Sequence, residues 1–195
     1  MDGNRIKNLC LLAAFWVGFF LGILFINLWG DTYFRETSVL GRDTLIRISE
    51  ASIDTRSFFF YLLKMREQAL LMIWLLGYTI VGTWSVLILL GWLGFSAGVL
   101  LTTAVLKLRL TGILMFFLLI FPQICFYVPA VRMLCDGIWE RGKGRIKNRK
   151  TFQEWGSEKE YIFLLFLSAA CVMAGTALES FVNPPLIRWA IKYFL

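Results

Sequence analysis

Long apolar runs alternate with polar connections along the chain. Three runs, 9–29, 111–135 and 161–182, are long enough to cross about 30 Å of hydrocarbon as helices that rise about 1.5 Å per residue. A fourth run, 69–106, carries no charge and is too long for one crossing, so we divide it near Thr83 into spans 69–83 and 84–106. The pattern predicts an all-α polytopic membrane helical bundle of about five transmembrane helices.

Charge predicts which ends of these spans face the cytoplasm. Within the connection 136–160, six basic residues and no acid fall between positions 141 and 150: Arg141, Lys143, Arg145, Lys147, Arg149 and Lys150. Short loops rich in Lys and Arg stay cytoplasmic. Two spans within 69–106 place this loop on the same side as the basic N-terminal flank, whereas one span would separate them. We therefore predict an N-terminus inside and a C-terminus outside, with an outer loop 30–68 and an outer tail 183–195.

Composition supports a single integral membrane domain over 1–195. Hydrophobic residues make up 58% of the chain and the mean hydropathy is +0.70, against about 45–50% apolar residues in soluble domains. The net charge of the chain is +7, and the stretch 141–150 within the basic loop carries +6. That loop is read first as a topological signal, then as a contact for anionic membrane lipids or a cytoplasmic partner, and not as a nucleic-acid site. The first apolar run is longer than the core of a cleaved signal and is expected to be retained.

Residues that support catalysis are scarce. The chain has no histidine, and the four cysteines, Cys10, Cys125, Cys135 and Cys171, lie in or beside apolar spans without metal-ligand spacing. "GKGR" in the basic loop lacks the spacing of a phosphate-binding loop. We expect no catalytic residue, no metal and no cofactor.

Small residues recur at helical spacing on two spans. Gly18 and Gly22 follow Ala14 on the first, and Gly91, Gly94 and Gly98 lie along one face of the third. In lipid, such faces let helices approach closely. We interpret them as packing faces within the bundle, with a dimer or partner face as the alternative.

The span 111–135 contains Pro122 and Pro129 with Gln123 between them. An internal proline removes a backbone donor and clashes with a carbonyl one turn earlier, so this helix should kink or break twice. Gln123 would then satisfy a freed carbonyl or contact a substrate or partner.

Glu179 is an acid near the end of the last apolar run. Gly175, Cys171 and Ser168 lie on the same side, so the carboxylate should point into the bundle and meet a backbone donor or a basic group. Asn183 and Pro184 end the helix, and the following proline should prevent it from resuming. We predict that Glu179 fixes the end of the span, with the tail along the outer surface either as a docking face or as ordinary packing. A surface helix is also expected near 43–53.

Four stretches resemble the stage II sporulation protein M family of endospore-forming bacteria, and they occur in the order "YLLKMREQALLMIWLLGYTIVG", "GFSAGV", "FPQICFYVPA" and "ALESFVNPPL". Their shared order and spacing over roughly residues 60–190 make the resemblance specific. It implies a non-enzymatic role in engulfment, in the mother-cell septal or engulfing cell membrane. There the protein would recruit and anchor two cell-wall hydrolases, stage II sporulation proteins P and D. The competing hypothesis is a membrane subunit of a transport or export system, with Gln123 and Glu179 lining a pathway.

Overall fold

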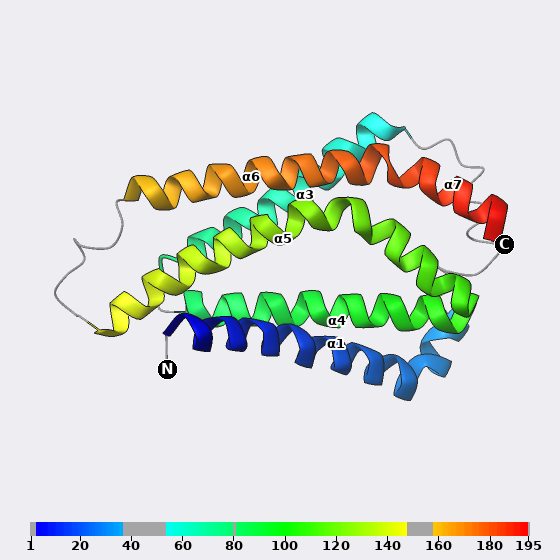
Figure 1. The fold of residues 1–195 in the computed structure, drawn as a ribbon, viewed down its shortest axis with the longest axis horizontal. Coiled ribbons are helices and arrows are strands. Elements are labelled where there is room, and N and C mark those ends of the chain that lie inside the picture. The colour runs from blue at the N-terminus through cyan, green and yellow to red at the C-terminus, as the bar shows by residue number, and fades with distance from the viewer. Residues whose placement is uncertain (1–2, 37–53, 80, 148–157, 195) are drawn as a thin grey trace. The chain divides into compact units, whose positions relative to one another are not determined.

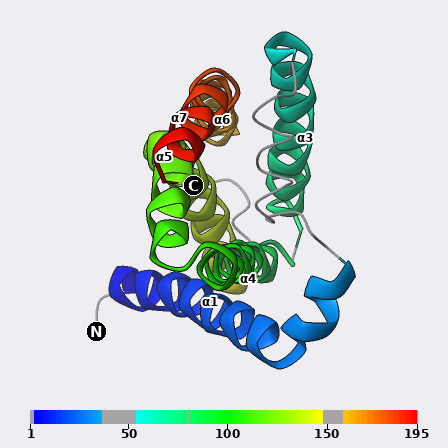
Figure 2. The ribbon, with the colours of Figure 1, turned by 90° about the vertical axis from the view of Figure 1, so that its right-hand side faces the viewer.

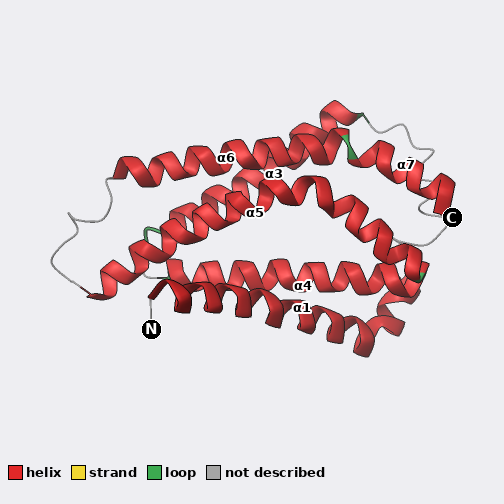
Figure 3. Ribbon diagram, in the orientation of Figure 1, coloured by secondary structure: helices red, strands yellow, loops and turns green. Residues whose placement is uncertain are grey.

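A computed structural model describes residues 3–36, 54–79, 81–147 and 158–194, and these ranges contain helices and turns but no strand (Figure 1; Figure 3). The helices are α1 (Gly3–Glu36), α3 (Thr55–Leu76), α4 (Gly82–Leu108), α5 (Leu110–Lys147), α6 (Glu158–Phe181) and α7 (Asn183–Phe194). The predicted all-helical class is confirmed for the part of the chain that is described.

Within the described ranges, three stretches are long and apolar enough to cross a membrane: Arg5–Gly30, Gly82–Leu108 and Lys159–Leu186. A fourth candidate arises if the two parts of the bent α5 form one span. The sequence predicted a further span at 69–83, but α3, although long enough at 22 residues, is not apolar enough because Lys64, Arg66 and Glu67 lie near its middle. Five crossings and their orientation therefore stay predictions.

The helices group into two compact units. The first comprises 1–54, 87–121 and 181–195, and the second comprises 55–86 and 122–180. The first unit is built on α1 and α4, which run side by side (Figure 1; Figure 2).

Glycines allow the backbones of α1 and α4 to touch. A Cβ on Gly18 would overlap the carbonyl oxygen of Gly91, and one on Gly22 would overlap that of Phe95. Gly94 and Gly98 of α4 lie equally close to carbonyl oxygens of α1. In lipid, where apolar surface alone does not drive association, such close approach supplies the packing and weak Cα–H···O contacts that hold helices together. The two glycine faces thus pack against each other within the chain.

A single residue separates α4 from α5. Arg109 adopts a left-handed conformation with φ of 55°, and its backbone N–H donates to the carbonyl of Val105. Gly112 then packs against the backbone of Ala104, where a Cβ would overlap the carbonyl oxygen. The corner is therefore very tight.

α5 carries both predicted prolines inside one long helix. It is bent by 50° between Leu118 and Ile120. Pro122 accounts for the position of this bend, because its ring clashes with the carbonyl of the residue four positions earlier. The sequence predicted a basic loop over 136–160. This prediction is wrong for the first half of the segment, because α5 continues as a helix to Lys147. Lys143 and Arg145 lie within this helix, whereas Arg149 and Lys150 fall outside the described residues.

The run 69–106 is divided between two helices, as predicted, but the break begins at Gly77, several residues before Thr83. α3 begins at Thr55 and ends at Leu76, the chain turns through Gly77, and α4 begins at Gly82. A Cβ at Gly77 would overlap the hydroxyl of Tyr161, so a larger residue does not fit at this turn. The polar stretch before 69, assigned to the outer loop 30–68, is therefore partly helical. The surface helix expected near 43–53 lies outside the described residues.

α6 ends at Phe181, close to the predicted end of the last span. The expectation that the prolines would prevent a new helix is wrong, because α7 begins directly at Asn183. Pro184 and Pro185 occupy its first turn. A proline is tolerated there because the first backbone N–H groups have no partner within the helix. The tail is thus an ordered helix that follows α6 after a one-residue interruption at Val182.

Candidate functional site

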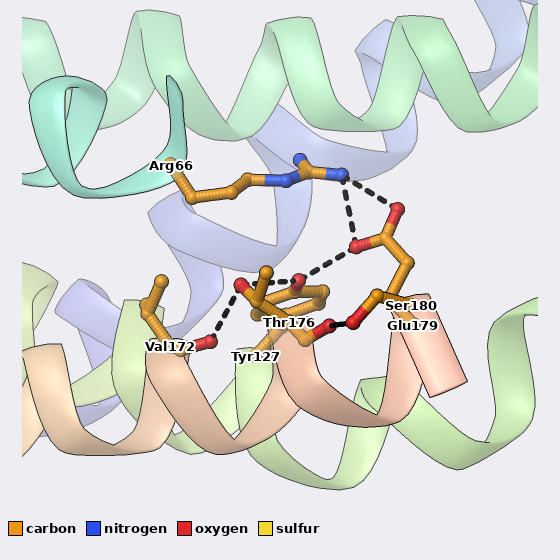
Figure 4. Close-up of polar contacts among 6 residues, drawn as sticks. All are labelled: Arg66, Tyr127, Val172, Thr176, Glu179 and Ser180. Carbon is orange, nitrogen blue, oxygen red and sulfur yellow. Dashed lines mark hydrogen bonds and ion pairs between the residues drawn. The ribbon is translucent and has the colours of Figure 1, made fainter. Parts of the chain in front are cut away.

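Polar groups from three helices of the second unit converge on Glu179 (Figure 4). Arg66 of α3 reaches its carboxylate through Nη2, at 3.2 Å from Oε1 and 3.4 Å from Oε2. Tyr127 of α5 donates its hydroxyl hydrogen to Oε2 at 2.6 Å. Glu179 therefore joins α3 and α5 to α6. We call Arg66, Tyr127, Thr176 and Glu179 the Glu179 cluster.

Small residues on α6 make room for this arrangement. Gly175 lies under the ring of Tyr127, and a Cβ there would come within 2.8 Å of a ring carbon. Thr176, next to it, is fully buried and its Oγ1 lies 3.2 Å from the hydroxyl of Tyr127. Thr176 and Ser180 also donate to carbonyls one turn earlier in α6, which satisfies hydroxyls that have no access to water.

Glu179 and Arg66 form a salt bridge at the edge of the cluster. The Glu179 side chain is only 15% exposed, whereas that of Arg66 is 44% exposed. The guanidinium also lies over the Tyr127 ring, 5.3 Å from its centre, where the negative face of the ring attracts a cation. A charge taken out of water is costly unless it is paired and hydrogen-bonded, and here the carboxylate is both. The arrangement serves to fix helices and neutralise charge.

A second cluster lies at the other end of α6. The rings of Trp74 and Tyr161 stack with centres 5.2 Å apart, and Tyr78 meets both rings edge-on. Tyr161 donates to the carbonyl of Trp74 at 2.9 Å, while the indole of Trp74 donates to the carbonyl of Tyr161 at 3.3 Å. Arg141 of α5 places its guanidinium 4.4 Å from the centre of the Tyr78 ring and 4.1 Å from that of Tyr161. These four residues form the Tyr161 cluster.

The two clusters show that α3 accompanies α6 over most of its length. Tyr161 and Glu179 are separated by about 27 Å along α6 at 1.5 Å per residue. Trp74 of α3 contacts the first level and the long side chain of Arg66 reaches the second. Residues 67–73 of α3 therefore lie between the levels of these two contacts.

The structure brings together only some of the predicted site residues. Glu179 meets a basic group, as the sequence indicated, and Gly175 lies beside it. Pro122, Gln123 and Pro129 lie in α5 outside the two clusters, and Gln123 makes an interaction within the chain. Arg141 packs on tyrosine rings, whereas the sequence indicated a topological signal first and a lipid headgroup or partner contact as alternatives.

Sequence reasoning missed Arg66, Tyr127 and the aromatic partners of Arg141. Arg66 lies in a polar stretch that was assigned to the outer loop, so nothing marked it as a counter-charge. A usable signal existed, because an acid in an apolar span calls for a basic partner in the same bundle.

The described ranges hold no group of three or more side chains that could together ligate a metal ion. The four cysteines are free thiols, and Cys135 is the one that is fully buried.

Comparison with known proteins identifies the family of the chain. The family model described as Stage II sporulation protein M matches residues 11–184, which is most of the chain. No curated protein and no solved structure matches it. The apolar helices agree with a family of membrane proteins associated with sporulation. The chain therefore belongs to the stage II sporulation protein M family.

Proposed function

We propose that this protein is a non-enzymatic membrane scaffold that acts during engulfment in sporulation. It recruits and anchors cell-wall hydrolases, stage II sporulation proteins P and D, at the septal or engulfing membrane. Family membership supports the sporulation role, and the chemistry of the described residues supports a scaffold.

The observation that carries the proposal is the engagement of Glu179. This carboxylate is held by Arg66 and Tyr127, two residues before α6 ends and four before α7 begins. It braces three helices seven residues before the last apolar stretch ends at Leu186. A scaffold needs such rigidity, because a fixed surface lowers the entropic cost of binding a partner.

The scaffold is proposed to have five crossings, with the N-terminus in the cytoplasm and α7 on the outer side. α3 is not among the candidate spans because of its central charges, yet it contacts both ends of the candidate span in α6. Pairing with Glu179 neutralises Arg66, which makes a crossing by α3 tolerable. An outward α7 would be available to partners that act on the wall.

The transport hypothesis receives less support. A pathway requires polar groups that can exchange contacts with a moving substrate. Glu179 is already bonded to two neighbours in the same unit, and Gln123 is engaged within the chain.

Purification of the full-length protein from membranes of sporulating cells, followed by identification of its companions, tests the proposal. Recovery of cell-wall hydrolases supports the scaffold, whereas recovery of an ATPase without hydrolases would favour transport. The purified protein alone is expected to release no soluble fragments from isolated sacculi. Fragment release that persists through rigorous repurification would overturn the non-enzymatic assignment.

A further inference from the structure

One face of α3 packs against the rest of its unit, and the opposite face is exposed. Arg66, Leu70 and Trp74, spaced four residues apart, face its neighbours in the unit. Along the middle of this broad exposed face, six residues follow alternating steps of four and three, flanked by the exposed Phe60, Met65 and Met72: Ser57, Tyr61, Lys64, Gln68, Leu71 and Leu75. We call these six residues the α3 seam. This spacing is that of a seam along which two helices pack side by side.

Two polar residues interrupt the α3 seam at its centre. Within the part of the chain that the structure describes, neither Lys64 nor Gln68 makes a hydrogen bond or an ion pair, and Glu67 forms no ion pair with Lys64. Gln68 lies between Arg66 and Trp74, and hence between the two levels at which α3 contacts α6. On the proposed topology, its amide lies inside the membrane. Polar groups exposed at that depth are costly and usually face a partner.

We propose that the α3 seam is the docking surface for a transmembrane helix of another protein, one that carries a carboxylate opposite Lys64. The inference rests on the proposed scaffold function and specifies the chemistry of its partner. A carboxylate complements the ammonium of Lys64, and a polar group one turn deeper satisfies the amide of Gln68. Small and aliphatic side chains of the partner then pack on Leu71 and Leu75, which are 45% and 57% exposed.

Charge argues against a second copy of this chain as the occupant. Copies in one membrane share an orientation, so a symmetric pair along this seam would bring the two Lys64 side chains together. Depth argues against a lipid headgroup, because Gln68 lies one turn deeper than Lys64 and needs its own partner.

The proposal can be tested with a synthetic probe helix in vesicles. The full-length protein, with its four cysteines replaced by serine and with Leu71→Cys, is reconstituted in phosphatidylcholine vesicles. The probe is a palindromic Leu/Ala helix of about 20 residues, long enough to span the bilayer. It carries Glu and Cys seven residues apart, which is the spacing of Lys64 and Leu71. Disulfide cross-linking should favour this probe about tenfold over a probe with Leu in place of Glu.

Charge exchange makes the test specific. Lys64→Leu should abolish the preference for the Glu probe, and Lys64→Glu should transfer it to a matched Lys probe. Gln68→Leu should weaken cross-linking to a Glu probe that carries Gln at the facing level. A cysteine at Phe166 of α6, a position that is 69% exposed, should show no preference among probes.

Four outcomes would overturn the proposal. They are the absence of any preference, a preference that survives Lys64→Leu, disulfides between two copies of the protein without probe, and loss of the preference when phosphatidylglycerol is added. The third identifies a second copy as occupant, and the fourth identifies an anionic lipid. The probe experiment is independent of the hydrolases, so its success without co-purifying hydrolases would refute the proposed function alone.

Discussion

Gly18 and Gly91 face each other at the α1–α4 contact, yet they are expected to respond differently to substitution. A Cβ on Gly18 would overlap the Gly91 carbonyl, whereas a Cβ on Gly91 would lie 3.7 Å from the nearest carbonyl oxygen, an ordinary contact. Gly18→Ala should therefore lower the free energy of unfolding by about 1–3 kcal/mol, and Gly91→Ala should change it by less than about 1 kcal/mol.

Denaturation in mild detergent, followed by tryptophan fluorescence, measures both variants. Because the two substitutions add the same methyl group, a difference reports geometry and not helix propensity. Equal effects would show that the two helices do not approach as closely as described.

Glu179 and Tyr127 yield a second prediction at the residue scale. Hydrogen bonds to a charged group contribute about 1.5–3 kcal/mol. Glu179→Leu should lower the free energy of unfolding by about 2–3 kcal/mol, Glu179→Gln by roughly half as much, and Tyr127→Phe by about 1–2 kcal/mol. A double-mutant cycle with Arg66→Leu should show coupling to Glu179 and none to Gly91→Ala.

Membrane level and partner recovery are measured on the same Glu179 variants. If Glu179→Leu leaves stability, level and recovery unchanged, Glu179 neither holds the end of α6 nor shapes a docking surface.

The sequence reveals a site residue only where its chemistry conflicts with its surroundings. Glu179 stood out because it is an acid within an apolar run. Arg66 did not, because its neighbours Lys64 and Glu67 make the stretch look like an ordinary polar loop. Tyr127 is one of many aromatic residues in its helix, and its hydroxyl becomes informative only once Glu179 is seen 2.6 Å away.

At the scale of the helices, the backbone of Arg109 is strained at the corner between α4 and α5, and this strain can be tested. A left-handed conformation costs a residue with a side chain about 1–2 kcal/mol, and glycine adopts it freely. Arg109→Gly should therefore raise the free energy of unfolding by about 1 kcal/mol, even though it removes a positive charge.

Leu106→Gly is the matched control, since it introduces glycine within α4, where it should lower the free energy of unfolding by about 1 kcal/mol. Thermal unfolding in detergent compares the two. A decrease for both variants would contradict a left-handed conformation at position 109.

Helix boundaries were predictable where hydropathy changes sharply and not elsewhere. The end of α6 was predicted within one residue because a polar, proline-containing stretch follows it. The start of α3 at Thr55 could not be predicted, because Lys64, Arg66 and Glu67 interrupt its apolar pattern and make the stretch look like a connection between spans. Likewise, the start of α7 could not be predicted, because its two prolines would break the interior of a helix but are tolerated in a first turn.

For the whole molecule, the central prediction is the proposed orientation of the chain. Reporter fusions after residue 195 should be active only with an external reporter, and fusions at residue 145 only with a cytoplasmic one. The physical reason is the excess of Lys and Arg between 141 and 150. A cytoplasmic reporter active at 195 and inactive at 145 would reverse the orientation and remove α7 from the wall side.

The ion pair between Arg66 and Glu179 also constrains how the protein is made. Its two residues are 113 positions apart, so α3 leaves the ribosome long before its counter-charge exists. On the proposed topology, α3 cannot settle in the bilayer as it emerges and must wait beside the insertion machinery until α6 follows. A chain that stops at residue 156 should therefore leave α3 accessible to water-soluble cysteine reagents at position 68, and completion of α6 should protect it. In this order of assembly, α6 must be present before α3 can insert stably, although α3 is synthesised first.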